Sequence, residues 1–223
     1  MPADYDHLLR LAARRHSCRA FTGRVVPRVE IERMLTLAQH AASWCNTQPW
    51  QVAVTSGPTT TALADRLTAA ALAGERRSDL PRPAAYTGIY RDRRREAGHG
   101  LYAGLGIDRA DGEARTRQAL ENFRFFGAPH TAIVTTDRDL GTYGAVDCGA
   151  YVAALLLAAE SLGLGAIAQA AIATVSDAVR EFLELPESRL VVCAVSFGYA
   201  DEEHPANRFR VGRAALDQVV TWV

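Results

Sequence analysis

The chain has 223 residues, of which 48% are hydrophobic and 22% charged, and its 25 basic and 25 acidic residues give zero net charge. This composition is typical of a globular domain, and the neutral average field argues against electrostatic steering towards nucleic acid or anionic lipid. We expect no secretory signal, and the longest apolar stretch, Ala150 to Ala159, is too short to span a bilayer. The four cysteines are scattered without a CxxC pair, so we expect neither a disulfide framework nor a metal site, and we predict a cytoplasmic protein.

The first part of the chain predicts three helices and one strand. They are the helices Asp4 to Arg15, Val29 to Ala42 and Thr60 to Ala73, and the strand Gln51 to Thr55. Residues 76–114 are rich in glycine, proline, arginine and tyrosine, which predicts a long loop-like insertion of the kind that forms lids. This insertion contains a basic run, Arg91 to Arg95, which we interpret as a solvated face, with binding of a nucleotide cofactor's phosphate as the alternative.

The second part predicts three more helices and two strands. They are the helices Arg115 to Phe126, Val146 to Leu162 and Val175 to Leu183 (capped by Thr174 or Ser176), and the strands Thr131 to Thr135 and Leu190 to Phe197. The helix from Val146 is apolar on nearly every face, so it must be buried in a core or a subunit interface. Helices outnumber and separate the strands, which indicates a single α+β or α/β domain over residues 1–223, with a small sheet flanked by helices.

Two polar clusters follow the first two predicted helices. Ser43 to Trp50 lies between a helix and a strand, where binding residues concentrate on loops held by a rigid scaffold. The segment Arg15-His16-Ser17-Cys18-Arg19 offers two guanidiniums, an imidazole and a hydroxyl, a set that suits phosphate oxygens. The alternative for this second cluster is a helix end whose cationic side chains complement the helix dipole. A third basic stretch, Asn207 to Arg213, is either an exposed turn or a further source of guanidiniums.

Other motifs carry less weight. Gly163 to Ala168 matches G-x-G-x-x-A, but a helix rather than a strand precedes it, so we reject a dinucleotide fingerprint and expect the glycines to end that helix. Gln169 follows directly and could contact a ligand ring. Cys45 lacks a nearby base and is interpreted as a packing residue rather than a nucleophile. The remaining histidines show no paired spacing and are interpreted as structural or surface residues: His40, His99, His130 and His204.

Together these motifs resemble the FMN-dependent nitroreductase family. The family's R-[RH]-S-x-[RK] motif is matched at Arg15 to Arg19, and its S-x-x-N-x-Q-P-W motif at Ser43 to Trp50. The pattern D-x-G…LAA-x-x-x-G-L-G is matched from Asp147 to Gly165, and the segments around Tyr90, Leu101 and Asn122 are similar to the branch that acts on nitroaromatic acids.

The resemblance implies a domain-swapped homodimer with a mostly antiparallel sheet and two FMN molecules at the interface. The residues that it implies for FMN binding are Arg15, His16, Ser17, Arg19, Arg210 and Arg213 near the phosphate and ribityl chain, Ser43, Trp44, Asn46 and Gln48 beside the isoalloxazine, and Gln169 and Ala170 near its reactive edge. Of the isoalloxazine residues, Ser43, Trp44 and Asn46 would come from the other subunit. The tail, Val219 to Val223, would cross to the partner's sheet.

The activity implied by the resemblance is a ping-pong transfer of hydride from NADH or NADPH, through FMN, to a nitroaromatic, quinone or activated alkene. No catalytic side chain is expected, because the chemistry belongs to the flavin. The alternatives are a specialised activity of the same fold (flavin fragmentation, dehalogenation or dehydrogenation) and a flavin-storage protein without turnover. The chain departs from the family at Ala42 and Ala168, where proline is common, and at Trp44-Cys45, where small residues are common; the indole would narrow the space beside the flavin.

Overall fold

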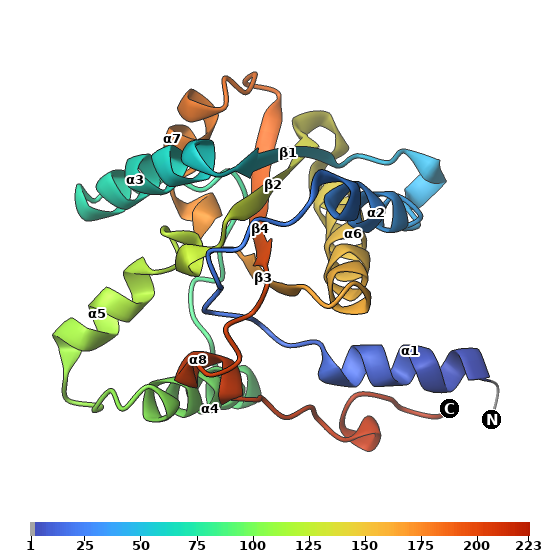
Figure 1. The fold of residues 1–223 in the computed structure, drawn as a ribbon. Coiled ribbons are helices and arrows are strands. Elements are labelled where there is room, and N and C mark those ends of the chain that lie inside the picture. The colour runs from blue at the N-terminus through green and yellow to red at the C-terminus, as the bar shows by residue number, and fades with distance from the viewer. Residues whose placement is uncertain (1–2) are drawn as a thin grey trace.

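A four-stranded antiparallel sheet forms the centre of the protein, a computed structural model that describes residues 3–223 (Figure 1). The strands are β1 (Gln51–Ser56), β2 (His130–Asp137), β3 (Gly165–Gln169) and β4 (Arg189–Gly198), in the order β1-β2-β4-β3. Every neighbouring pair is antiparallel. The predicted α+β class with a small antiparallel sheet is therefore confirmed, and β3 is a strand that the sequence did not predict.

Helices cover both faces of this sheet, which gives three layers (Figure 1). On one face, α2 (Arg28–Ala38) and α6 (Gly141–Ser161) pack through Met34, Tyr151 and Leu155. On the other face lie α3 (Pro58–Leu72) and α7 (Ser176–Phe182), with a second core around Leu63 and Phe125. The two cores share β2, because successive side chains of a strand point to opposite faces.

The segment 76–114, predicted to be loop-like, is about half helical. It contains α4 (Gly88–Gly104) and the start of α5 (Gly112–Leu120), which Asp111 caps by accepting a hydrogen bond from the Ala114 amide at 2.8 Å. The glycines of α4 misled the prediction, since glycine disfavours helix. Gly100 is explained by packing: a Cβ there would overlap the ring of Phe209, which follows the short helix α8 (Pro205–Arg208). α4 and α8 thus form a small unit beside the sheet (Figure 1).

Several predicted boundaries need correction. The first helix, α1, spans Ala3–Arg14, and α2 ends at Ala38 rather than Ala42. The helix predicted to run to Phe126 ends at Leu120, and Phe125 and Phe126, with φ of 56° and 53°, could not have continued it. The predicted caps of α7 are also wrong: Val175 is the N-cap residue, and the Ser176 hydroxyl instead donates to the Arg77 carbonyl at 3.1 Å.

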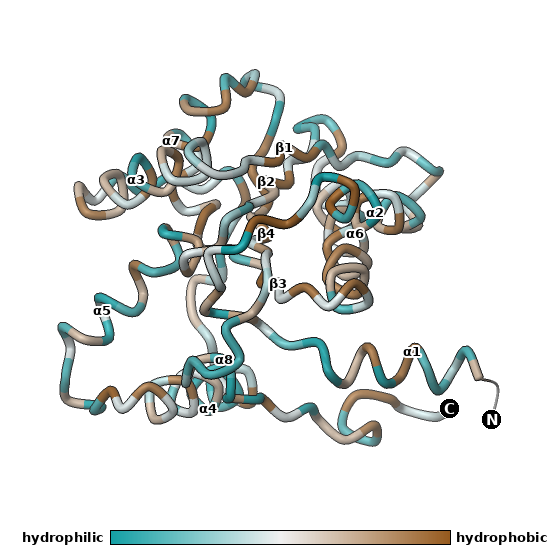
Figure 2. Tube along the Cα trace, in the orientation of Figure 1, coloured by the Kyte–Doolittle hydropathy of each residue, from teal (hydrophilic) through white to brown (hydrophobic). Residues whose placement is uncertain are grey.

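The long helix α6 is only half buried within one chain. Its residues are mostly hydrophobic along its length (Figure 2), and the segment Arg138–Ser161 is long and apolar enough to cross a membrane by length and composition alone. One face of α6 packs on the sheet. The other face is exposed: Tyr143 and Val146 are each more than half exposed, and Ala150 and Ala153, further along the helix, are exposed as well. One chain therefore buries only one face of α6 and leaves an apolar face exposed, so burial of the other face in a subunit interface stays a prediction.

The two ends of the chain add further exposed apolar side chains. Leu8 and Leu9 of α1 are both about half exposed, and no residue of α1 is buried. The tail forms a 3-10 turn at Leu216–Gln218 and no strand afterwards, and Trp222 is 85% exposed. These surfaces lie on the same side of the molecule in Figure 1, where both termini also lie.

Candidate functional site

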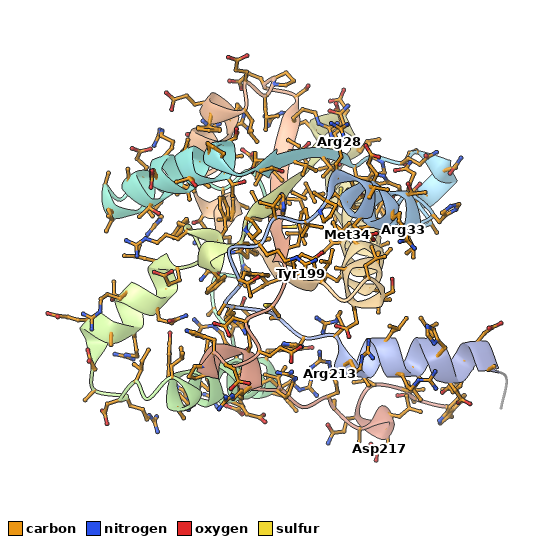
Figure 3. All side chains as sticks on the ribbon, viewed as in Figure 1. Arg28, Arg33, Met34, Tyr199, Arg213 and Asp217 are labelled. Atoms are coloured by element: carbon orange, nitrogen blue, oxygen red, sulfur yellow. The ribbon has the colours of Figure 1, made fainter. Side chains whose placement is uncertain are left out.

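The cluster Arg15 to Arg19 and the basic tail meet in one cavity. The cavity has a volume of about 300 Å³ between the end of α1 and the residues after α8. Figure 3 shows Arg213 of the tail beside the C-terminal end of α1. The lining residues are Ala12, Ala13, Arg15, His16, Ser17, Arg19, Phe209, Arg210, Val211 and Arg213. Residues almost 200 positions apart in the sequence therefore line one cavity.

The first wall of the cavity is held against the free edge of β3. Ser17 forms a parallel bridge with Ala166, and the Cys18 amide donates to the Ala166 carbonyl at 3.1 Å. Cys18 is fully buried, and a Cβ at Gly165 would lie 2.8 Å from its sulfur. Gly165 is thus required for this close approach rather than for a helix end, which Gly163 supplies with φ of 70°.

The second wall is tied to the first by Asn207, a residue that sequence reasoning did not select. Its side-chain oxygen accepts from the Arg19 amide at 2.6 Å, and its nitrogen donates to the Ala20 and Asp201 carbonyls at 2.8 Å each. Asn207 is 4% exposed, so these bonds are well shielded from water. Its only signal in the sequence is its position just before the basic tail.

Positive charge accumulates in the cavity without compensation. Arg15, Arg19, Arg210 and Arg213 form no ion pair with any carboxylate in residues 3–223. Burial and then the charge of Arg213 lower the pKa of Arg15, while Glu160 opposes the shift. Burial also lowers the pKa of Arg19. A site that destabilises its own cations in this way is prepared for an anion.

The surroundings of the His16 side chain support the same conclusion. Its Nδ1 contacts the Arg14 carbonyl at 3.2 Å, but its Nε2 is buried and has no hydrogen-bond partner within the described chain. Burial is the main cause of a lowered pKa for His16, and the nearby Arg210 charge lowers it further. A buried polar atom without a partner is unfavourable, and an oxygen-rich ligand in the cavity would satisfy it.

The loop from Ser43 to Gln48 is strained and exposed. Cys45, Asn46 and Gln48 all have positive φ, at 51°, 55° and 47°, a region that costs non-glycine residues about 1–2 kcal/mol each. Ser43 Oγ accepts from the Gln48 amide at 2.9 Å, which closes the loop. Such strain persists where surrounding structure enforces it and is concentrated at functional sites.

This loop is fixed to the exposed end of α6. The Trp44 amide donates to Asp147 at 3.1 Å, and the Trp44 ring meets Tyr143 edge-on with centroids 4.4 Å apart. Trp44 is nevertheless 59% exposed. In Figure 1 the loop lies beyond α2, away from the arginine cavity, and none of its residues lines that cavity. Within one chain the structure therefore does not bring the two strongest motifs together.

Gln169 and Gln48 are less available than the sequence suggested. The Gln169 side chain is 2% exposed, donates to the Asn122 carbonyl at 2.7 Å and accepts from the Ser196 hydroxyl. The Gln169 side-chain amide therefore already has two protein partners. Of Gln169 and Ala170, only Ala170 is exposed at the surface. The Gln48 side chain bonds Gln39 at 2.9 Å and the Asn46 carbonyl at 3.2 Å, although it remains exposed.

The interpretation of His130 as a structural residue is confirmed. It is 1% exposed, its Nε2 accepts from the Val26 amide at 3.0 Å, and its Nδ1 lies 2.7 Å from the Ser56 hydroxyl. Cys45 is exposed, which contradicts a role in packing. Across residues 3–223, no group of three His, Cys, Asp or Glu side chains is arranged to hold a metal ion.

Comparisons with known proteins identify the family. Residues 12–199 match the model of the nitroreductase family. The chain is 36% identical to nitroreductase NfnB of Mycolicibacterium smegmatis, covering 94% of this chain and 89% of that protein. It is also 36% identical to a 4-nitrobenzoate reductase of a Nocardioides species, covering 94% and 87%. The crystal structure of the FMN-dependent NfnB from Mycobacterium smegmatis in complex with NADPH superposes with a TM-score of 0.94, at 34% identity over 99% of this chain and 100% of that one. The chain therefore belongs to the nitroreductase family.

Proposed function

We propose that this protein is an FMN-dependent oxidoreductase that uses NADPH or NADH to reduce nitroaromatic compounds. The observation that carries the proposal is the cavity of uncompensated arginines beside the buried, unpartnered Nε2 of His16. Related proteins support it, since NfnB is described as FMN-dependent and two relatives are 4-nitrobenzoate reductases.

The cavity residues fit the phosphate end of FMN. A phosphate monoester carries nearly two negative charges and three acceptor oxygens, which suits Arg15, Arg19, Arg210 and Arg213. The negative charge of the phosphate would offset burial and the repulsion from Arg213, the two causes that lower the Arg15 pKa. Ser17 offers a short hydroxyl donor, and His16 Nε2 would gain a partner in the phosphate or the ribityl hydroxyls.

We propose further that the site is completed by a second copy of the chain. The exposed face of α6, with Tyr143 and Val146, is an apolar surface of the kind that marks an interface. The loop carrying Trp44 and Asn46 is fixed at the edge of this face. In a homodimer about α6, this loop would be donated to the partner's arginine cavity, and the apolar tail around Trp222 would be covered by the partner.

Bound FMN would supply the redox chemistry, accepting hydride from the nicotinamide and passing electrons to the acceptor. The protein's own contribution is binding and orientation. The arginine cavity would hold the phosphate end, and the partner's loop from Ser43 to Gln48 would form a wall beside the flavin, where the Trp44 ring would narrow the space for the acceptor. The backbone amide of Ala170, directly after β3, would be a candidate for the donor that stabilises negative charge at the flavin edge.

The test begins with the visible spectrum of the purified protein. The proposal expects a flavin spectrum near one FMN per chain, bleaching by NADPH or NADH in stopped flow, and recovery of colour with 4-nitrobenzoate or nitrobenzene. A yellow protein that no nicotinamide bleaches would favour flavin storage. Bleaching without recovery by any nitroaromatic would favour a specialised activity, and a protein that cannot bind FMN would refute the proposal.

All four cysteines are unpaired in the described chain, which supports a reducing, cytoplasmic location.

A further inference from the structure

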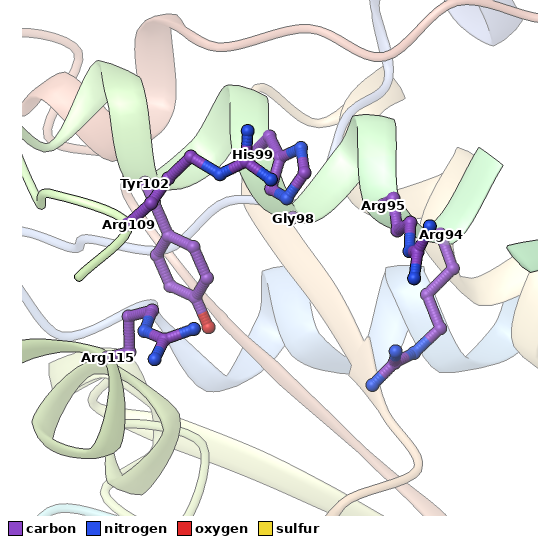
Figure 4. Close-up of a pocket in the computed structure, with 7 residues that line it drawn as sticks. All are labelled: Arg94, Arg95, Gly98, His99, Tyr102, Arg109 and Arg115. Atoms are coloured by element: carbon purple, nitrogen blue, oxygen red, sulfur yellow. The ribbon is translucent and has the colours of Figure 1, made fainter. Parts of the chain in front are cut away.

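A second basic pocket lies outside the arginine cavity, on the segment of α4 and α5. It has a volume of about 500 Å³ and is lined by Arg94, Arg95, Gly98, His99, Tyr102, Arg109 and Arg115 (Figure 4). Residues 94, 95, 98, 99 and 102 lie on one face of α4, since they repeat at helical spacing. Arg109 comes from the turn after α4, and Arg115 from the start of α5.

The guanidiniums of this pocket are not used by the fold. Arg95 and Arg109 form no hydrogen bond or ion pair within residues 3–223, whereas Arg115 bonds only the Asp111 carbonyl at 3.3 Å. Arg94 lies over the Tyr86 ring at 5.2 Å. No carboxylate lines the pocket. The neighbouring arginines Arg91 and Arg117 differ, since each pairs with an acidic residue next to it or one helical turn away. Four cations without a counter-charge around one hollow favour a multiply charged anion over a single carboxylate.

The fold explains why a nucleotide reductant would need such a pocket. Dinucleotide domains hold the pyrophosphate on a glycine-rich turn between a parallel strand and a helix. Here all strand pairs are antiparallel, and the glycine pattern at residues 163–168 leads into strand β3 instead of a helix. This turn is therefore not available to hold the phosphates of the reductant, and exposed guanidiniums are an alternative source of donors. The α4–α5 segment stands beside the arginine cavity, because Phe209 lines that cavity and packs on Gly100 of α4.

We propose that the pocket formed by Arg94, Arg95, Arg109 and Arg115 binds the 2′-phosphate of NADPH and thereby selects NADPH over NADH. This inference rests on the proposed function and extends it to the identity of the reductant. Tyr102 and His99 add a hydroxyl and an imidazole to the lining of the pocket; in Figure 4 Tyr102 lies beside Arg115 and His99 beside Arg109, while Arg94 extends from the opposite side.

The test uses the holoenzyme with the double substitution Arg95→Gln and Arg109→Gln, because neither side chain supports the fold. Flavin reduction is measured in stopped flow with NADPH and with NADH. The expected result is a rise of about tenfold or more in KM for NADPH, equivalent to the loss of one charge-assisted hydrogen bond. The KM for NADH and the FMN content should not change. Arg82→Gln, which removes an exposed arginine outside the pocket, is the matched control and should behave as the unsubstituted enzyme.

A binding experiment separates this pocket from the proposed activity. Calorimetric titration of the holoenzyme with 2′,5′-ADP and with 5′-AMP should show tighter binding of 2′,5′-ADP, and the double substitution should reduce the difference by about tenfold or more. The proposal is overturned by an unchanged KM for NADPH, by equal losses with both nicotinamides, or by an enzyme that uses NADH as well as NADPH. A raised KM for 4-nitrobenzoate but not nitrobenzene would assign the pocket to a substrate carboxylate and also overturn it. If the protein fails to bleach with either nicotinamide, the proposed function fails, while the titration still tests the pocket.

Discussion

Replacing Arg15 by Gln should change flavin affinity and stability in opposite directions. The Arg15 guanidinium has no hydrogen-bond partner within the described chain, and the Arg213 charge is a cause of its lowered pKa. Removing it should therefore raise the free energy of unfolding of the FMN-free protein, by less than about 1 kcal/mol for two partly solvated charges. The same change removes a charge-assisted bond to the FMN phosphate, worth about 1.5–3 kcal/mol. Because the side chain is only half buried, we expect the lower end of this range, which is about a tenfold rise in Kd.

The assay is a titration of FMN-free protein with FMN, followed by quenching of flavin fluorescence, together with urea unfolding without FMN. Arg28→Gln is the control, since it removes the same charge from a fully exposed arginine that pairs with Glu32 at 2.8 Å. Its FMN Kd should stay unchanged. The reasoning is refuted if Arg15→Gln binds FMN as tightly as the native protein. It is equally refuted if the FMN-free variant is less stable, because Arg15 would then be a structural residue.

Three further predictions concern the fold around the site. Asp79→Asn breaks a buried ion pair with Arg180 (2.8 Å, 3% and 12% exposed) and should lower the free energy of unfolding by about 3 kcal/mol in urea titrations. His130 is neutral in the folded protein because its Nε2 accepts a backbone hydrogen bond, and burial lowers its pKa. The unfolded chain therefore binds more protons below pH about 6.5, and stability should fall by up to about 1.4 kcal/mol per pH unit on acidification, a slope that His130→Gln should reduce. Gly100→Ala would push the Phe209 ring aside, so it should lower stability by about 1–3 kcal/mol and raise the FMN Kd, whereas Gly98→Ala, with open space around its Cβ position, should do neither.

Much of the arginine cavity could be predicted from the sequence, because its chemistry depends on the types of side chain that line it. A guanidinium, an imidazole and a hydroxyl within five residues point to an anion whichever backbone carries them. Asn207 could not be found in the same way. Its importance lies in three hydrogen bonds to distant backbone groups, and nothing in the local pattern distinguishes it from an exposed asparagine.

The errors in the fold have a common origin, which is that contacts between distant segments overrule local preference. Glycines made residues 88–104 look like a loop, yet the fit of Phe209 against Gly100 requires a glycine on that helix. Strand β3 is short and rich in alanine, a weak strand former, and it exists because β4 and Cys18 supply hydrogen bonds along it. The pair Phe125-Phe126, predicted to be helical, is left-handed, although neither residue prefers that conformation.

The half-exposed helix α6 has a consequence for handling the protein. In the proposed dimer, folding, association of the two chains and flavin binding are coupled equilibria. The folded fraction, the dimer fraction and the flavin occupancy therefore all depend on protein concentration by mass action. Dilution would then release FMN even at constant free flavin, because it removes the Trp44 loop that the partner contributes. Midpoints of thermal unfolding should rise with protein concentration, and added FMN should shift sedimentation towards the dimer. Flavin content measured at one concentration would thus describe the assembly as much as the intrinsic affinity of a single chain.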